Sequence, residues 1–156
     1  GGLLIFLLAV SITARNQVNR KTAELSVSEA RYRMLFENSP DHIFRLDQAG
    51  KILDYHSAQD FSFSNYIEKI DSKNLSELLP THLSEEFNAI IDTIFADGKE
   101  QIYEFQLDFD GVMHDFESRF FVSDNREIIA FVRDITERKK AEIELRESEK
   151  RYQTLA

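Results

Sequence analysis

The 156-residue sequence contains no cysteine and no tryptophan. The lack of cysteine excludes disulfides, cysteine nucleophiles, thiolate zinc sites and photochemistry through a cysteinyl adduct, and it fits a reducing compartment. Positive charge is also scarce, since 19 lysines and arginines against 28 aspartates and glutamates give a net charge of −9. Because nucleic-acid binding needs a basic face and the sequence offers none, we expect no nucleic-acid partner.

Common catalytic motifs are missing as well. The sequence has no nucleophile elbow, no glycine-rich phosphate loop and no paired-histidine zinc motif. Its four histidines, His42, His56, His82 and His114, are scattered. Asp54 and His56 would share a strand face and could in principle hold a metal, but two solvated side chains are the interpretation that we favour. We therefore expect no catalysis and no metal site in this fragment.

Apolar residues are abundant, at 42% with 13 phenylalanines, which is enough for a sizeable core. A continuous apolar run, LLIFLLAVSI, occupies Leu3–Ile12 and is shorter than the ~20 residues of a membrane span. The chain does not begin with Met and shows no basic leader or cleavage site. We expect residues 1–12 to be the second half of a membrane helix, with a buried core helix as the alternative.

The residues directly after this run carry Arg15, Arg20 and Lys21 without an acid. By the positive-inside rule, we expect the chain from this basic segment onward to lie on the cytoplasmic side of the inner membrane.

Residues 13–38 are predicted to form one long helix, and residues 137–156 a second one. Both carry an apolar seam with spacings of three and four residues. We expect a homodimer through these seams, with a monomeric helix that packs on its own domain as the alternative. The seam positions are Val18, Leu25, Ser28, Tyr32, Leu35, Ala141, Leu145 and Ser148.

The chain also begins to repeat itself. AELSVSEARYRML at Ala23–Leu35 resembles IELRESEKRYQTLA at the end of the chain, with Tyr32 matching Tyr152. We expect the tail to enter a second copy of the same domain.

Between the helices, residues 39–136 are predicted to form an α+β domain. Pro40 stops the first helix. A β-hairpin comes next, then a short helix in NLSELL and a longer helix over Leu83–Ala96. Three strands complete the domain, in QIYEFQLDF, DFESRFFV and EIIAFVRD. This order predicts a five-stranded antiparallel sheet with helices on one face.

These segments resemble a PAS domain, a sensory domain of bacterial signalling proteins, across Glu29–Lys140. SEARYRMLFENSPDHIFRLDQAGKI resembles the opening of such a domain, and YEFQL with FESRFF resembles a strand pair. FVRDITERKKAE is similar to the exit motif of the family, which is Asp134-Ile135-Thr136 followed by a charged helix. The resemblance implies the PAS fold and signal transmission through these three residues.

The resemblance also implies a wider layout. A membrane helix, a coiled coil, this domain and a downstream PAS domain would precede an output domain in the same chain. We expect a sensor histidine kinase, with a diguanylate cyclase or a phosphodiesterase as the alternative output.

By resemblance, a pocket would lie between the helices and the concave face of the sheet. We expect it to be lined by Phe44, Leu46, Tyr103, Phe105, Leu107, Glu117, Arg119 and Phe121. A buried Glu–Arg pair would either hold an anionic or polar ligand or pair with itself. The alternative, to which we give more weight, is a filled aromatic core with Glu117 and Arg119 solvated.

No cofactor is evident from the sequence, although an unknown small-molecule ligand is possible. Some PAS domains bind haem through a histidine of the long helix, but His82 stands at the start of this helix and should face water. The missing cysteine excludes a cysteinyl flavin. Two functions therefore compete: a ligand sensor, and a relay and dimerisation module without a ligand. A cavity with convergent polar groups would favour the sensor, and a filled aromatic interior the relay.

Overall fold

The structure is a computed structural model that describes residues 1–58, 73–109 and 111–155. The chain divides into two compact units, Gly1–Ser39 and Pro40–Ala156.

The first unit is the helix α1, Gly2–Glu37. It ends at Asn38, whose side-chain amide donates a 2.7 Å hydrogen bond to the carbonyl oxygen of Met34. No residue of α1 is buried, and the helix is long and apolar enough to cross a membrane by length and composition. The predicted seam residues of α1 are therefore all exposed in the single chain.

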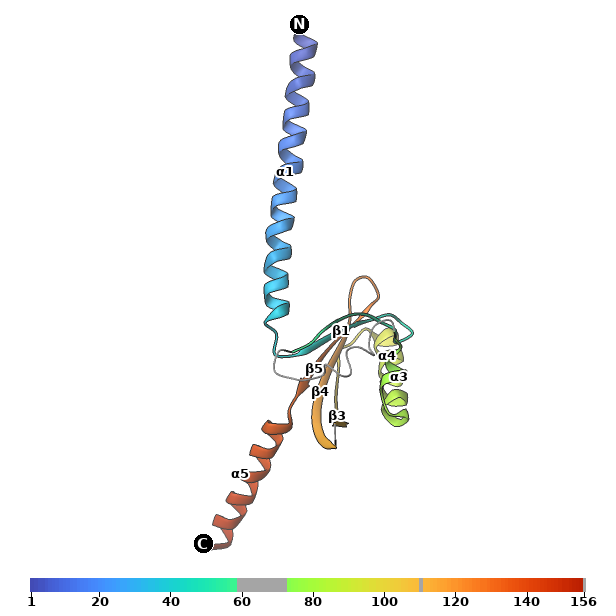
Figure 1. The fold of residues 1–156 in the computed structure, drawn as a ribbon, viewed down its shortest axis with the longest axis vertical. Helices are drawn as coiled ribbons and strands as arrows, with labels where there is room; N and C mark the ends of the chain where they lie inside the picture. The colour runs from blue at the N-terminus through green and yellow to red at the C-terminus, as the bar shows by residue number, and fades with distance from the viewer. Residues whose placement is uncertain (59–72, 110, 156) are drawn as a thin grey trace. The chain divides into compact units, whose positions relative to one another are not determined.

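The second unit contains one five-stranded sheet, and the predicted α+β architecture is confirmed. All neighbouring strands are antiparallel, in the order β2-β1-β5-β4-β3. Helices α3 (Leu75–Leu78) and α4 (Thr81–Asp97) lie against one face of this sheet, and α5 (Thr136–Leu155) follows β5 directly (Figure 1). The strands are β1 (His42–Leu46), β2 (Ile52–His56), β3 (Gln101–Phe109), β4 (Val112–Val122) and β5 (Ile128–Asp134).

Local residues explain where these elements start and stop. Gly50 adopts a φ of +78° in the β1–β2 turn, a conformation that side chains with a Cβ rarely adopt. Asn74 caps α3, because its Oδ1 accepts a 3.0 Å bond from the N–H of Ser76, while its Nδ2 donates to the carbonyl oxygen of Ala49. Gly98 ends α4 in the left-handed conformation.

The core lies between α4 and the sheet. Phe87 of α4 is its centre, since the ring stands edge-on to Tyr103 at 5.7 Å, Phe105 at 5.2 Å and Phe120 at 5.3 Å. Leucine and isoleucine side chains of α4, β1, β2 and β5 fill the rest of this cluster. They are Leu46, Ile52, Leu83, Ile91, Ile94 and Ile128.

Candidate functional site

A small, partly open cavity of about 70 Å³ lies beside the core. Phe44, Leu46, Phe105 and Leu107, which were predicted to line the pocket, do line this cavity. Tyr103 instead packs against the core cluster beside Phe87 and is not part of the lining. The remaining lining residues in the described part of the chain are all apolar: Leu75, Leu79, Phe87, Phe116, Phe120, Ala130 and Val132.

The expectation that Glu117, Arg119 and Phe121 face this pocket is wrong. Residues paired across antiparallel strands share a face, and Phe105 of β3 pairs with Phe116 of β4. The inward residues of β4 are therefore Phe116 and its alternate neighbours. Since the side-chain period of a strand is two, the predicted residues lie on the opposite face.

On that opposite face, the three residues border an open depression of about 300 Å³ together with Asp41, Glu100, Phe131 and Arg133. Nε of Arg119 lies 3.5 Å from Glu117 Oε1, and the Arg119 side chain is 55% exposed. The Glu117 side chain is 16% exposed, so the pair lies outside the core with only Arg119 well solvated.

Asp134, Ile135 and Thr136 form a tight connection between β5 and α5. Asp134 Oδ1 accepts hydrogen bonds from the backbone N–H and the hydroxyl of Thr136, at 2.9 and 2.5 Å. The hydroxyl oxygen of Thr136 in turn accepts a 2.9 Å bond from the N–H of Asp115 on β4. The backbone N–H of Ile135, a buried residue, donates to the carbonyl oxygen of Asp115 at 2.8 Å. The start of α5 is thus fixed to β4.

Hydrogen bonds keep the Asp134 carboxylate ionised. Burial raises the pKa of Asp134, but bonds from the side chain and backbone of Thr136 and from His114 outweigh it and hold the pKa below the usual range. His114 Nδ1 lies 2.8 Å from Asp134 Oδ2. Asp134 therefore connects β4, β5 and α5 through one charged group.

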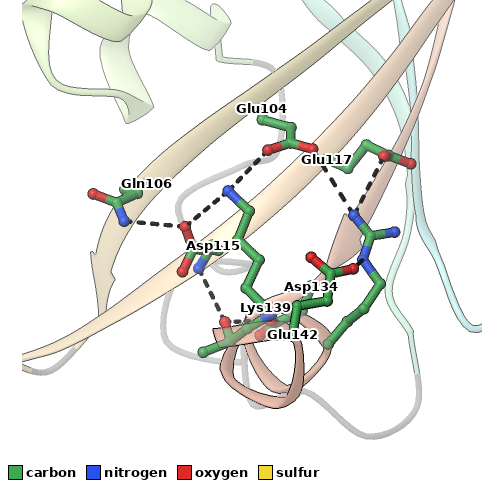
Figure 2. Close-up of polar contacts among 9 residues, drawn as sticks. Glu104, Gln106, Asp115, Glu117, Asp134, Lys139 and Glu142 are labelled. Atoms are coloured by element: carbon green, nitrogen blue, oxygen red, sulfur yellow. Dashed lines mark hydrogen bonds and ion pairs between the residues drawn. The ribbon is translucent and has the colours of Figure 1, made fainter. Parts of the chain in front are cut away.

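Two cations of α5 extend this junction onto the strands (Figure 2). Lys139 Nζ lies 2.8 Å from Glu104 Oε2 on β3 and 3.5 Å from Asp115 Oδ1 on β4. Nη2 of Arg138 lies 3.8 Å from both Glu104 Oε1 and Glu117 Oε2. The bond to Glu104 raises the pKa of Lys139, so this cation remains charged. We call these five residues the ionic clasp.

Sequence reasoning singled out Asp134, Ile135 and Thr136 but missed His114, Asp115 and the clasp. Their only sequence signal is the alternation of polar and apolar residues in β3 and β4, which is typical of any half-exposed sheet. Among the described residues, no group of three or more His, Cys, Asp or Glu side chains could hold a metal ion. His82 is exposed at the start of α4, as expected.

Neither a protein-family model nor a curated protein matches this chain. Solved structures do. The PAS domain of an HTR-like protein from Haloarcula marismortui has 23% identity and a TM-score of 0.56, over 75% of this chain and 99% of that one. A domain of a sensory box sensor histidine kinase/response regulator from Geobacter sulfurreducens has 21% identity and a TM-score of 0.56, over 70% of this chain and 96% of that one.

A third similar structure is the PAS domain of the RpfR quorum-sensing receptor of Cronobacter turicensis, in complex with C12:0. It has 16% identity and a TM-score of 0.52, over 63% of this chain and 96% of that one. At these identities the likeness shows the fold, and the domain of this chain has the PAS fold.

Proposed function

We propose that this domain is a signal-transmission module of a membrane-bound sensor protein, on the cytoplasmic side of the inner membrane. The observation that carries the proposal is the junction at Asp134-Ile135-Thr136, where backbone and charged bonds join the sheet to α5. A movement of β4 or β5 must therefore move the start of α5. The domain itself would catalyse no reaction, and the output would be a histidine kinase, or alternatively a diguanylate cyclase or phosphodiesterase.

The interior supports a relay more than a sensor of polar ligands. Among the described residues, no polar side chain lines the 70 Å³ cavity, so this part of the chain brings no side-chain hydrogen-bonding groups to it. A charged ligand would lose its hydration without compensation in such a site.

Sensing of a small apolar molecule is the second candidate, favoured by the existence of the cavity and by the C12:0 complex of the similar RpfR domain. Native mass spectrometry and an absorption spectrum of the purified chain separate the two candidates. A bound mass that leaves on denaturation, or a visible band, supports the sensor. A bare protein mass with a featureless spectrum supports the relay.

Replacing Thr136 with valine is expected to lower the free energy of unfolding by about 1–2 kcal/mol, because two hydrogen bonds of the junction are lost. In the intact sensor, the same change should alter basal output, measured as autophosphorylation or cyclic-di-GMP turnover. Thr154→Val is the matched control, since the Thr154 hydroxyl binds only the carbonyl oxygen of Lys150 among the contacts of the described chain. Unchanged output in Thr136→Val, in spite of the lost stability, would contradict the transmission role.

A parallel homodimer through α1 and α5 would carry the signal between domains. Its support is the exposure of the apolar seam side chains, which are Val18, Leu25, Tyr32 and Leu35 on α1 and Leu145 on α5. The α5 seam, Ala141, Leu145 and Ser148, repeats the spacing of the α1 seam.

The substitutions Leu25→Asp and Tyr32→Asp are expected to convert this dimer to a monomer in detergent, because each places a charge at the seam. Sedimentation equilibrium measures the change. Val27→Asp is the control, since Val27 is equally exposed on α1 but lies off the seam. A dimer that persists in both seam variants would contradict the seam.

A further inference from the structure

One cation of the ionic clasp, Arg138, has a second partner on its own helix. Nε of Arg138 lies 3.7 Å from Glu142 Oε1, four residues further along α5. Lys139 precedes Glu142 by three residues, and side chains at this spacing are neighbours on a helix surface. One carboxylate of α5 is therefore within reach of both cations that hold α5 to the sheet.

The strand partners and the helix partner of Arg138 are nearly equivalent in distance. The nitrogens of its guanidinium lie 3.8 Å from Glu104 and Glu117 on the strands and 3.7 Å from Glu142. The side chains of Arg138, Glu104 and Glu142 are about half exposed, at 50%, 46% and 60%. Exchange of Arg138 between Glu104 and Glu142 therefore needs little desolvation, whereas the Glu117 carboxylate, whose side chain is 16% exposed, loses a partner on release.

Repulsion between two acids opposes release of the clasp. Glu104 and Glu117 are direct partners across β3 and β4, and like charges at such positions repel. Arg138 contacts both carboxylates and relieves this repulsion. Release would restore it, but the Arg138–Glu142 ion pair within α5 would remain and Lys139 would join it. Opposite contributions of similar size are what a two-state element requires.

We propose that Glu142 competes with the strand carboxylates for Arg138 and Lys139. The first turns of α5 then alternate between a clasped state, with both cations on β3 and β4, and a released state, with both on Glu142. The exchange itself follows from the clasp, whereas its use in signalling rests on the proposed function.

The clasp connects α5 to the core. Glu104 lies between Tyr103 and Phe105, whose rings pack against Phe87 on the other face of the same strand. The backbone bonds at the start of α5 reach β4, while the direct contacts of α5 with β3 in the described chain end on Glu104. A shift of β3 with its aromatic side chains thus changes the distance between Glu104 and Lys139 and the balance of the two states.

Amide hydrogen exchange of residues 139–142, measured on the full chain at low salt, tests the competition. In Glu104→Gln the clasp loses a partner, and exchange should become about 2- to 5-fold faster. In Glu142→Gln the competitor is lost, and exchange should become slower by a similar factor. A Glu142 that merely stabilised its own helix would give the opposite sign, because its loss would speed exchange.

Glu144→Gln is the matched control, with the same charge change on the same helix but no ion pair among the described residues. Salt at about 1 M, where the Debye length is about 3 Å, should reduce both differences. Faster exchange in Glu142→Gln, or rates equal to those of the control in both variants, would overturn the proposal. If exchange becomes faster in Glu104→Gln and slower in Glu142→Gln while the output of Thr136→Val is unchanged, the competition for the cations is supported and only the proposed signalling function is contradicted.

Discussion

Replacing Phe87 with alanine is expected to lower the free energy of unfolding by about 3–5 kcal/mol. The side chain is only 4% exposed, and its ring contacts three other aromatic rings edge-on. Phe87 also lines the 70 Å³ cavity, so its truncation enlarges an existing space that the neighbouring rings cannot close without losing their own contacts. Urea unfolding followed by circular dichroism measures the loss.

Two controls define this prediction. Glu86→Ala changes an exposed neighbour on the same helix and should stay within about 0.5 kcal/mol of the wild type. Benzene should restabilise Phe87→Ala but not Glu86→Ala, because apolar cavities of about 150 Å³ bind benzene. A loss below about 1 kcal/mol in Phe87→Ala would mean that the aromatic cluster is not the centre of the core.

Acidification from pH 6.5 to pH 4 is expected to remove about 3 kcal/mol of stability through His42 alone. Burial lowers the pKa of His42 from 6.5 to about 4, against the smaller opposing effect of Asp134 and Asp41. The side chain is 2% exposed, and its Nδ1 accepts a 3.2 Å hydrogen bond from the N–H of Ala58. Between pH 6.5 and pH 4, His42 is protonated in the unfolded chain but largely neutral in the folded chain. Stability therefore falls as the pH falls, and is fully present above pH 6.5.

The pH dependence of urea unfolding tests this in wild type and in His42→Gln. The slope between pH 6.5 and pH 4 should be shallower in the variant, whereas His82→Gln, at an exposed histidine, should keep the wild-type slope. Because the buried substitution can itself weaken the fold, the titration of His42 in the wild type, followed by its NMR shifts, is the second measurement. A midpoint near 6.5 would contradict the burial argument.

Local signals were sufficient to predict the elements of this fold. Gly50, Asn74 and Gly98 mark a turn, a helix start and a helix end, and each acts within a few residues of the chain. The positions of the hairpin, of α4 and of the last three strands could therefore be predicted, and with them the sheet.

The face that each residue of β4 presents could not be predicted in the same way. Its two alternating sets both contain aromatic residues, because Phe120 and Phe121 are adjacent, so hydrophobicity does not decide between them. The choice is made by register with β3, which pairs Phe116 with Phe105. The ionic clasp escaped prediction for the same reason, since Glu104 and Lys139 meet only once the strands are paired.

The single residue between β5 and α5 has a mechanical consequence. β5 ends at Asp134 and α5 begins at Thr136. The connection between strand and helix is therefore a single residue, Ile135, which is buried. A helix of 20 residues is about 30 Å long. Pivoting α5 by about 5° at Thr136 would therefore carry its far end, at Leu155, through on the order of 3 Å. The helix amplifies movement, so displacements at the sheet that are too small to alter its hydrogen bonds become displacements of atomic size at Leu155.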